Sequence, residues 1–435
     1  MDGKKHSKKF LIKWTKTVKI LAHGFAKWHC VCYNKYNETK LMQLRPHQID
    51  SLVAMQSNTK GQVIVPTGGG KTMCMIEDAI YQFKSAPKTI VVVAPRILLA
   101  KQLCSEFREM IDIHPDDVMH VHSGDLTGKS LYFCSTQVND VKLFHYANKG
   151  KNTLMFTTYH SLHKIVESGI NVDTIYFDEA HNGVQKNFVE AVEYFSMYSA
   201  RAYFFTATPK HSLTPLKVGM NDADIFGNVI CQVPAPKLVE EGHILPPKVA
   251  VYKTRILEKD ELVVDADCDQ MINALDNIQK NKVLICAKST KQITNLISQT
   301  PFVMDLQVRG YNWMFITSKT GAFVNGKKVS REEFFNTLNE WGVDGTKFVV
   351  LHHSILSEGI NVKGLEAVLF MRSMDYIGIS QTIGRVIRKG AEDKVYGLVC
   401  VPVYSKVGIS TARKVEAVID TVFNKGQAAT SVIRS

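Results

Sequence analysis

The sequence predicts an α/β protein with two doubly wound parallel-sheet lobes in tandem and a small basic N-terminal domain. Short apolar runs alternate with amphipathic helical stretches, and this alternation occurs twice along the chain. A glycine-rich segment, residues 66–70, directly follows one of the apolar runs and precedes a helical stretch. Residues 1–43 lack the alternation and are rich in lysine, so we expect them to form a separate unit.

The N-terminal unit is strongly basic. Residues 1–43 contain ten lysines against Asp2 and Glu38, a charge of +8 out of +12 for the whole chain. Such a segment attracts phosphates without regard to sequence, although a solvated tail is the alternative. Aromatic residues such as Trp14 and Trp28 lie among the lysines. They favour a folded unit with base-stacking surfaces, and we expect residues 1–43 to bind nucleic acid.

Composition sets further limits. A length of 435 residues corresponds to two or three domains of about 150 residues each. No run of about 18 apolar residues occurs, and no secretory signal is evident, so we expect no membrane contact. Nine scattered cysteines fit a reducing cytoplasm, which would be the host cytoplasm if the chain is viral. Cys30 and Cys32 follow His29, but no second ligand pair at zinc-finger spacing accompanies them.

The first lobe is expected over residues 44–232. Its buried parallel strands are expected at residues 62–65, 89–94, 154–157, 174–177 and 203–206. Helices are expected at residues 72–83 and 97–110, where apolar residues recur at helical spacing. Strands that alternate with helices in this way form a parallel sheet covered on both faces.

Prolines interrupt the alternation between the lobes, and residues 233–275 are expected to be a linker or hairpin. The second lobe is expected over residues 276–435. Its predicted strands are residues 283–287, 314–317, 348–351, 367–371 and 397–401. Its predicted helices are residues 289–299, 331–341 and 380–389, followed by a last helix at residues 411–423.

The glycine-rich segment has the features of a phosphate-binding loop. It reads Val65-Pro66-Thr67-Gly68-Gly69-Gly70-Lys71-Thr72, and it departs from the strict pattern because Val65 replaces a glycine. Backbone N–H groups of a glycine-rich loop can surround phosphates, and the following helix directs its positive end toward them. Lys71 can reach the β- and γ-phosphates, and Thr72 can ligate Mg²⁺. The segment therefore predicts ATP binding by residues 66–72.

Two adjacent acids, Asp178 and Glu179, follow the predicted strand 174–177. A charge pair on an edge strand would be the plain interpretation, but the carboxyl ends of parallel strands are where ligands bind in such sheets. Asp178 is expected to hold Mg²⁺, and Glu179 to orient and deprotonate the attacking water. In the second lobe, Arg385 and Arg388 are expected on one helix face, placed to stabilise a γ-phosphate in transfer.

These segments, in this order, resemble the superfamily 2 helicases of the DEAD/DEAH class. Asp178-Glu179-Ala180-His181 spells the DEAH box, and Thr206-Ala207-Thr208-Pro209 matches the coupling motif that follows it. The resemblance covers about residues 44–400 and implies two RecA-like domains. It also implies that the residues coupling ATP to nucleic acid are His181, Thr206, Thr208 and Gln381.

Further motifs of the family have counterparts here. Residues 44–48 resemble the adenine-reading motif, in which Arg45 and Gln48 would contact ATP. Residues 357–362 resemble a motif that contacts both strand and nucleotide, with Gly359 at the ATP, although Asn361 stands where many relatives have an acid. The resemblance implies that Pro95, Arg96, Thr157 and Thr158 contact the nucleic-acid backbone, and we expect Ser318 and Thr320 of the second lobe to contact it as well.

Residues 226–247 resemble the passage between the lobes of restriction-type motors and phage UvsW-type helicases. By that resemblance we expect an ATP- and Mg²⁺-dependent DNA helicase acting on branched DNA, such as forks and four-way junctions, with phage replication or recombination proteins as candidate partners. Single-stranded DNA is a further expected substrate. The alternatives are an RNA helicase, a motor subunit that translocates for a partner nuclease, and a nucleotide-gated binding module with little catalysis.

Overall fold

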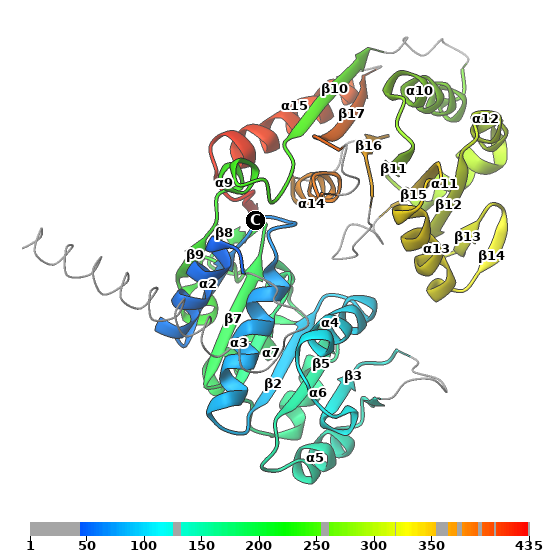
Figure 1. Ribbon diagram of the computed structural model, residues 1–435. Helices are drawn as coiled ribbons and strands as arrows, with labels where there is room; N and C mark the ends of the chain where they lie inside the picture. Colours follow the sequence, from blue (N-terminus) through cyan, green and yellow to red (C-terminus); the bar gives the residue numbers. More distant parts are fainter. Residues whose placement is uncertain are drawn as a thin grey trace, which may run out of the picture.

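The computed structural model describes residues 44–124, 132–253, 261–317, 319–353, 364–371, 376–389, 394–403 and 406–433. These residues form two α/β lobes (Figure 1). The basic N-terminal domain expected at residues 1–43, with Cys30 and Cys32, lies outside the described residues. Ser318, Gly359 and Asn361 lie outside them as well. In the described ranges, no helix is both long and apolar enough to cross a membrane.

The first lobe is built on an eight-stranded sheet with the order β4-β3-β5-β2-β6-β7-β1-β9. Every neighbouring pair in it is parallel, as the βα alternation predicts. The strands are β1 (Lys60–Ile64), β2 (Thr89–Ala94), β3 (Val118–Val121), β4 (Phe133–Cys134), β5 (Thr153–Thr158), β6 (Thr174–Phe177), β7 (Arg201–Thr206) and β9 (Val229–Gln232).

Helices cover both faces of this sheet. They are α2 (Pro46–Ser57), α3 (Lys71–Ser85), α4 (Ile97–Met110), α5 (Val138–Ala147), α6 (Leu162–Ser168), α7 (Val189–Tyr198) and α8 (Ala223–Phe226), with short 3-10 turns at Pro115–Asp117 and Ala180–Asn182. In β2, Val92 and Ala94 belong to one buried apolar cluster, whereas Val91 and Val93 belong to another on the opposite face. This two-residue alternation explains why β2 reads as a continuous apolar run.

The second lobe has its own eight-stranded sheet, ordered β10-β17-β16-β11-β15-β12-β13-β14. Its strands are β10 (Pro247–Lys253), β11 (Lys282–Cys286), β12 (Asn312–Thr317), β13 (Gly321–Val324), β14 (Lys327–Val329), β15 (Phe348–His352), β16 (Ala367–Phe370) and β17 (Gly397–Val403). Only the β12–β13 and β13–β14 pairs of this sheet are antiparallel. Its helices are α10 (Val263–Ile278), α11 (Thr290–Gln299), α12 (Phe302–Val308), α13 (Arg331–Val343), α14 (Tyr376–Val386) and α15 (Lys406–Ile419).

The passage between the lobes differs from the expectation of a linker or hairpin. Helix α9 (Ala235–Glu240) lies at its start, and β10 then joins the second sheet as an edge strand beside β17. Helix α10 contributes Met271 and Leu275 to the core of the second lobe. The prolines at residues 246 and 247 obscured this strand, because proline usually argues against a strand. It is tolerated here because β10 begins at Pro247 and lies at the edge of the sheet.

The C-terminal segment returns to the first lobe. Helix α15 packs on β17 and α14, as expected of a last helix on the second lobe, and ends in a π-helical turn at Asp420–Asn424. Strand β18 (Ser431–Ile433) then pairs in parallel with β8 (Lys210–Ser212) of the first lobe. Ser431 N also donates to the Pro209 carbonyl oxygen at 3.1 Å. The two lobes are therefore connected twice, by the passage after α9 and by this strand.

Candidate active site between the lobes

The predicted phosphate-binding loop joins β1 to α3. Gly68 and Gly70 both have φ of +86°, a left-handed conformation that glycine adopts without strain. Gly70 caps the N-terminus of α3, and a Cβ atom there would collide with Gln48 Nε2. Lys71 and Thr72 form the first turn of α3, at its positive end. The loop therefore has the backbone shape of an anion cradle, although it lacks one glycine of the strict pattern.

The first turn of α2 holds the carbonyl groups of this loop. Arg45 Nη1 donates to the Gly68 oxygen at 3.3 Å, His47 Nε2 to the Gly69 oxygen at 2.7 Å, and Gln48 Nε2 to the Gly70 oxygen at 3.2 Å. Three consecutive carbonyls are thus satisfied by three side chains, which fixes the loop before any ligand binds. Arg45 and Gln48 were expected at the nucleotide. His47 was not, and its position within residues 44–48 was the only signal that could have indicated it.

The two acids lie where the sequence places them, at the C-terminal end of β6 (Thr174–Phe177). Both are buried, and Glu179 has a φ of 47°, in the left-handed region that residues other than glycine seldom occupy. Glu179 Oε1 lies 3.1 Å from Lys71 Nζ, so the lysine of the loop and the second acid form an ion pair. The backbone strain at Glu179 directs this carboxylate toward the loop.

The adjacent acids have opposite pKa shifts. Burial, together with the negative charge of Glu179, raises the pKa of Asp178 to about 7, and Lys71 opposes this only in part. Burial also favours the neutral form of Glu179. The charges of Lys71 and His181 outweigh it, however, and hold the pKa of Glu179 below its usual value. Near neutral pH Glu179 is therefore ionised, while Asp178 holds its proton to a higher pH than a free carboxyl does in the absence of a cation.

The four residues expected to couple ATP to nucleic acid are in contact. His181 Nδ1 lies 3.0 Å from Thr206 Oγ1 and 3.4 Å from Thr208 Oγ1. Across the boundary between the lobes, Gln381 Nε2 lies 3.3 Å from His181 Nε2. Thr206 and Thr208 are fully buried, and Thr208 N donates to Thr206 Oγ1 at 3.0 Å. One hydrogen-bonded group thus extends from α14 of the second lobe to the end of β7.

The second-lobe arginines face the first lobe across a cavity of about 710 Å³. Residues of both lobes line it. Those predicted to bind ATP or catalyse its hydrolysis are Arg45, Gln48, Thr67, Gly68, Gly70, Lys71, Thr72, Asp178, Glu179, Arg385 and Arg388, and the predicted coupling residue Gln381 lines it as well. Helix α14 ends at Val386, earlier than expected, so Arg388 follows the helix instead of sharing its face with Arg385. Gly384 permits this approach, since a Cβ there would lie 2.5 Å from Thr67 Cβ.

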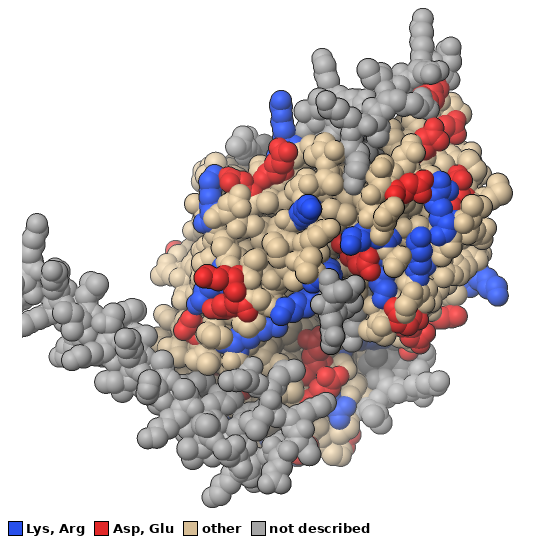
Figure 2. Space-filling view, turned by 45° about the horizontal axis from the view of Figure 1, so that its top comes forward, with Lys and Arg blue, Asp and Glu red and all other residues tan. Residues whose placement is uncertain are grey.

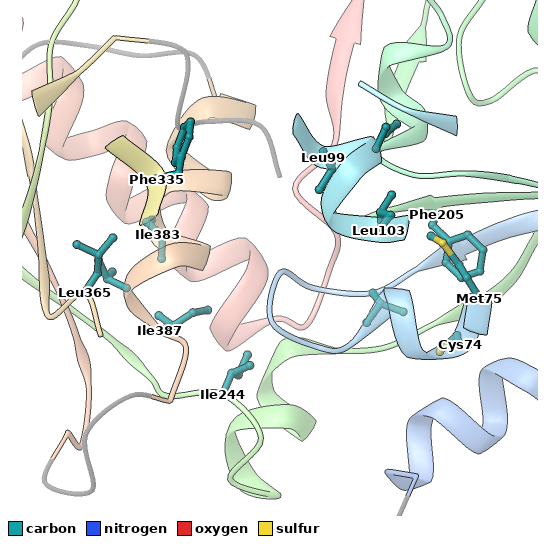
Figure 3. Packing of buried hydrophobic residues seen from close by; sticks show 14 of the residues in the cluster. Cys74, Met75, Leu99, Leu103, Phe205, Ile244, Phe335, Leu365, Ile383 and Ile387 are labelled. Carbon is teal, nitrogen blue, oxygen red and sulfur yellow. The ribbon is translucent and has the colours of Figure 1, made fainter. Parts of the chain in front are cut away.

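Apolar contacts support the same boundary. The buried cluster that contains Met75 and Leu103 of the first lobe also contains Ile383 and Ile387 of the second (Figure 3). Ile244, from the passage between the lobes, belongs to it as well, and Leu245 N donates to the Ile387 oxygen at 2.7 Å. The cavity is therefore bordered by a continuous apolar core.

The residues predicted to contact nucleic acid differ in how exposed they are. Arg96 is exposed at the start of α4, Pro95 is buried beside it, and Thr320 is half-buried in the turn after β12. The Thr157 hydroxyl is buried and donates to the Val121 oxygen at 2.8 Å, so it is engaged inside the sheet, and contact between Thr157 and nucleic acid stays a prediction. Thr158 is buried as well, with its hydroxyl 3.5 Å from Ser161 Oγ.

One arginine near this face was not anticipated from the sequence. Arg331 is the first residue of α13, and its side chain is exposed. Burial of part of the group and the positive charge of Arg96 both lower the pKa of Arg331. Two arginines from different lobes therefore face one region.

Residues 41–211 match the family model described as the Type III restriction enzyme, res subunit. The matched segment contains the loop and both acids but none of the second lobe. Among solved structures, the chain is similar to the ATP-dependent Type ISP restriction-modification enzyme LlaBIII bound to DNA, with a TM-score of 0.68 and 18% identity. That alignment covers 92% of this chain and 32% of LlaBIII. No curated protein sequence gives a match.

Two structures with bound RNA are also similar. Mss116p bound to single-stranded RNA and AMP-PNP aligns with a TM-score of 0.59 and 17% identity, over 91% of this chain and 75% of that one. Dbp5 of S. cerevisiae, bound to RNA and ADP BeF3, aligns with a TM-score of 0.55 and 14% identity, over 90% and 94%. At these identities the likenesses show the fold, which this chain shares with both the DNA-bound and the RNA-bound proteins.

The family match and this shared fold support an ATP-hydrolysing enzyme of the helicase type. The chain spans about a third of the length of LlaBIII. Its two lobes correspond to two RecA-like domains, as the sequence resemblance implied.

Proposed function

We propose that ATP binds in the cavity between the lobes and that its hydrolysis moves the lobes along nucleic acid. The observation that carries this proposal is the lining of the cavity, which combines Lys71 and Glu179 of the first lobe with Arg385 and Arg388 of the second. A ligand with several negative charges would join the lobes, and loss of its terminal phosphate would weaken that junction.

The residues of the cavity fit ATP with Mg²⁺. Positive φ angles at Gly68 and Gly70 shape the loop, and α3 directs its positive end to the same place. The Thr72 hydroxyl and the Asp178 carboxylate are oxygen ligands of the kind that Mg²⁺ prefers. When bound, Mg²⁺ would neutralise phosphate charge. Its presence would also favour ionised Asp178, whose pKa is raised in this structure.

The ion pair between Lys71 and Glu179 is the proposed state of the site before ATP binds. At 3.1 Å, Lys71 neutralises the carboxylate that is proposed as the general base. A triphosphate would compete for Lys71 through its larger negative charge. Glu179 would then be released to accept a proton from water, with its orientation set by the left-handed backbone at that residue. Binding of substrate would in this way switch on the base.

We propose that nucleic acid lies across both lobes and is held through its phosphates, without regard to sequence. Arg96 and Arg331 approach the same region from different lobes, which suits one continuous backbone. On the face shown in Figure 2, lysines and arginines are interspersed with acids and do not form one large basic area.

DNA is the favoured track, and branched DNA in replication, recombination or repair is the favoured substrate. The first point is supported by the restriction-type family match and by the likeness to a DNA-bound enzyme. The second rests on the sequence resemblance of residues 226–247 to UvsW-type helicases. The test is ATP hydrolysis in the presence of single strands, forks, four-way junctions or RNA. We expect the strongest stimulation by forks or junctions, and equal stimulation by plain single strands would reject the branched-DNA proposal.

A second candidate is a motor that translocates on duplex DNA for a partner nuclease. The observation in its favour is that this chain corresponds to only about a third of a restriction-modification enzyme. Displacement of a protein roadblock without displacement of a DNA strand would favour this candidate. The likeness to RNA-bound structures keeps RNA as an alternative track, and stimulation by RNA but not by the matching DNA would select it.

A further inference from the structure

Three side chains with metal-binding groups meet at the edge of the phosphate-binding loop. His47 comes from the first turn of α2, whereas Glu241 and His243 come from the passage between the lobes, directly after α9. One nitrogen of each imidazole and one carboxylate oxygen lie within 4.8 Å of one another. Residues almost 200 positions apart in sequence are thus brought to one point.

His47 is oriented as a metal ligand. Its side chain is 1% exposed, and its Nε2 faces the Gly69 carbonyl oxygen at 2.7 Å. A carbonyl can only accept, so Nε2 carries the ring proton and Nδ1 has a free lone pair. Among the described residues, none supplies a hydrogen bond to this buried Nδ1, which faces Glu241 Oε2 at 4.0 Å. In metal-binding histidines, the ring nitrogen that does not bind the metal commonly donates its N–H to a backbone carbonyl in this way.

The distances suit one small cation. His243 Nε2 lies 3.4 Å from Glu241 Oε2, and the two imidazole rings are 5.6 Å apart. Ligands at about 2.0–2.1 Å from a tetrahedral ion are separated by about 3.4 Å. The 4.0 Å gap at His47 therefore needs a shift of about 0.6 Å, and atoms within 4.8 Å of one another need shifts of at most about 1.4 Å, which side-chain rotation supplies. We propose that His47, Glu241 and His243 bind a divalent transition metal, with Zn²⁺ as the best fit.

The donor set selects this class of ion. Two imidazole nitrogens and one carboxylate oxygen suit Zn²⁺, whereas Mg²⁺ and Ca²⁺ prefer oxygen ligands alone. Lys237 Nζ lies 4.0 Å from the other oxygen of Glu241, Oε1, and Arg45 and Lys389 lie near His243. These positive charges weaken the binding of a cation but leave Oε2 directed at both imidazoles. Three protein ligands would leave a fourth position for water.

A metal here would clamp the passage between the lobes to the loop. His47 holds the Gly69 carbonyl, so the ion would be connected to the loop through one imidazole ring. His243 also lines the cavity between the lobes, which brings the metal site to the edge of the nucleotide site. The site is built from its own side chains and does not depend on the proposed binding of ATP.

The test uses the full chain with Cys30→Ser and Cys32→Ser, which removes the cysteines near the N-terminus as zinc ligands. Chelator-treated protein is titrated with Zn²⁺ alone against a chromophoric indicator, and Co²⁺ absorption reports the ligand geometry. We expect one Zn²⁺ per chain. His243→Ala and Glu241→Gln should each weaken Zn²⁺ binding by about 100-fold. Loss of a group that only hydrogen-bonds to a metal ligand lowers metal affinity by about 10- to 100-fold, and loss of a ligand itself should cost at least as much.

His163→Ala is the matched control, because His163 lies 3.9 Å from Glu167 in an exposed pair that no third ligand among the described residues completes. It should leave the affinity unchanged, and His243→Cys should restore binding lost in His243→Ala. Circular dichroism checks that each variant is folded. Absence of stoichiometric Zn²⁺, or equal affinity in all variants, would overturn the proposal and leave these residues as an ordinary histidine–glutamate cluster.

Discussion

The side-chain amide nitrogen of Gln381 lies 3.3 Å from Nε2 of His181, and this contact joins the two lobes. An amide nitrogen can only donate, so Nε2 accepts and Nδ1 of His181 carries the ring proton toward Thr206. Both partners are buried, each residue being 8% exposed. Asn182 Nδ2 also lies 3.4 Å from Nε2 of His181, so partners from both lobes hold the ring, and Gln381 is the one from the opposite lobe. This contact gives a physical route for coupling.

Gln381→Ala should separate ATP hydrolysis from its stimulation by nucleic acid. Loss of a buried hydrogen bond costs about 1–3 kcal/mol, which corresponds to a loss of stimulation of about 5- to 150-fold. Basal hydrolysis should change little, because Gln381 is not among the residues proposed to contact the reacting phosphate. Steady-state hydrolysis with and without DNA measures both. Gln299→Ala, an exposed glutamine at the end of α11, is the control. Unaltered stimulation would argue against the coupling role.

Arg388→Ala should stop hydrolysis while nucleotide binding persists. Removal of a guanidinium that stabilises a γ-phosphate in transfer lowers turnover by about 10³- to 10⁵-fold. The binding of a fluorescent ATP analogue should weaken far less, since the loop and Lys71 remain. Arg413→Ala, an exposed arginine on α15, should have no effect on either measurement. Normal turnover in Arg388→Ala would remove this residue from the mechanism.

Asp178→Asn should stabilise the protein that lacks nucleotide and Mg²⁺, and only at higher pH. The pKa of Asp178 is raised from 3.8 to about 7, so the folded state prefers the protonated acid. This preference stabilises the fold below pH 4 and is lost as the pH rises through 7. We expect the free energy of unfolding of the variant to exceed that of the natural protein by on the order of a few kcal/mol at pH 8, and to equal it at pH 4.

Thermal unfolding at the two pH values measures this difference. Asp276→Asn is the control, because Asp276 is exposed and Arg309 lowers its pKa. Because the pKa of Asp276 is lowered, its ionised carboxylate stabilises the folded protein at any pH above the ordinary pKa of an aspartate. Removal of this charge should therefore not stabilise the protein at pH 8. A gain of equal size for Asp178→Asn at both pH values would contradict the assigned ionisation.

Asp78→Asn should destabilise the first lobe. Asp78 is fully buried, and it accepts from Arg201 at 2.9 and 3.1 Å and from the Tyr176 hydroxyl at 2.7 Å. Loss of its charge leaves Arg201 largely buried without its anion, at a cost of about 3–5 kcal/mol. Urea denaturation measures the change, with the exposed pair of Arg309 and Asp276 as control. Arg309→Ala should cost at most about 1 kcal/mol.

Much of the fold could be predicted because several of its strands are buried on both faces. The strands at residues 89–94 and 174–177 and the helix at residues 97–110 have the bounds that their apolar patterns predict. Short or edge elements have no such pattern. Strand β10 begins at a proline, and β18 has three residues and pairs with a strand about 220 positions away. Nothing local in the sequence indicates a partner at that distance.

The site was predictable to the extent that short motifs contain its chemistry. Lys71 and Asp178 line the same cavity because the carboxyl ends of parallel strands meet at one edge of the first sheet, and Arg385 reaches it from helix α14 of the second lobe. The arrangement around each side chain was not predictable. His47 holds the loop through a tertiary hydrogen bond, and the Thr157 hydroxyl is directed into the sheet at Val121. Neither fact depends on a spacing that the sequence displays.

The most direct measurement of the central claim is ATP hydrolysis by the full chain and by Lys71→Ala, each with and without DNA. We expect hydrolysis that DNA stimulates in the natural protein, and a loss of at least about 100-fold in Lys71→Ala. Lys84→Ala, an exposed lysine in the last turn of the same helix, should behave as the natural protein does. Hydrolysis in Lys71→Ala at the natural rate would show that the cavity between the lobes is not the site of turnover.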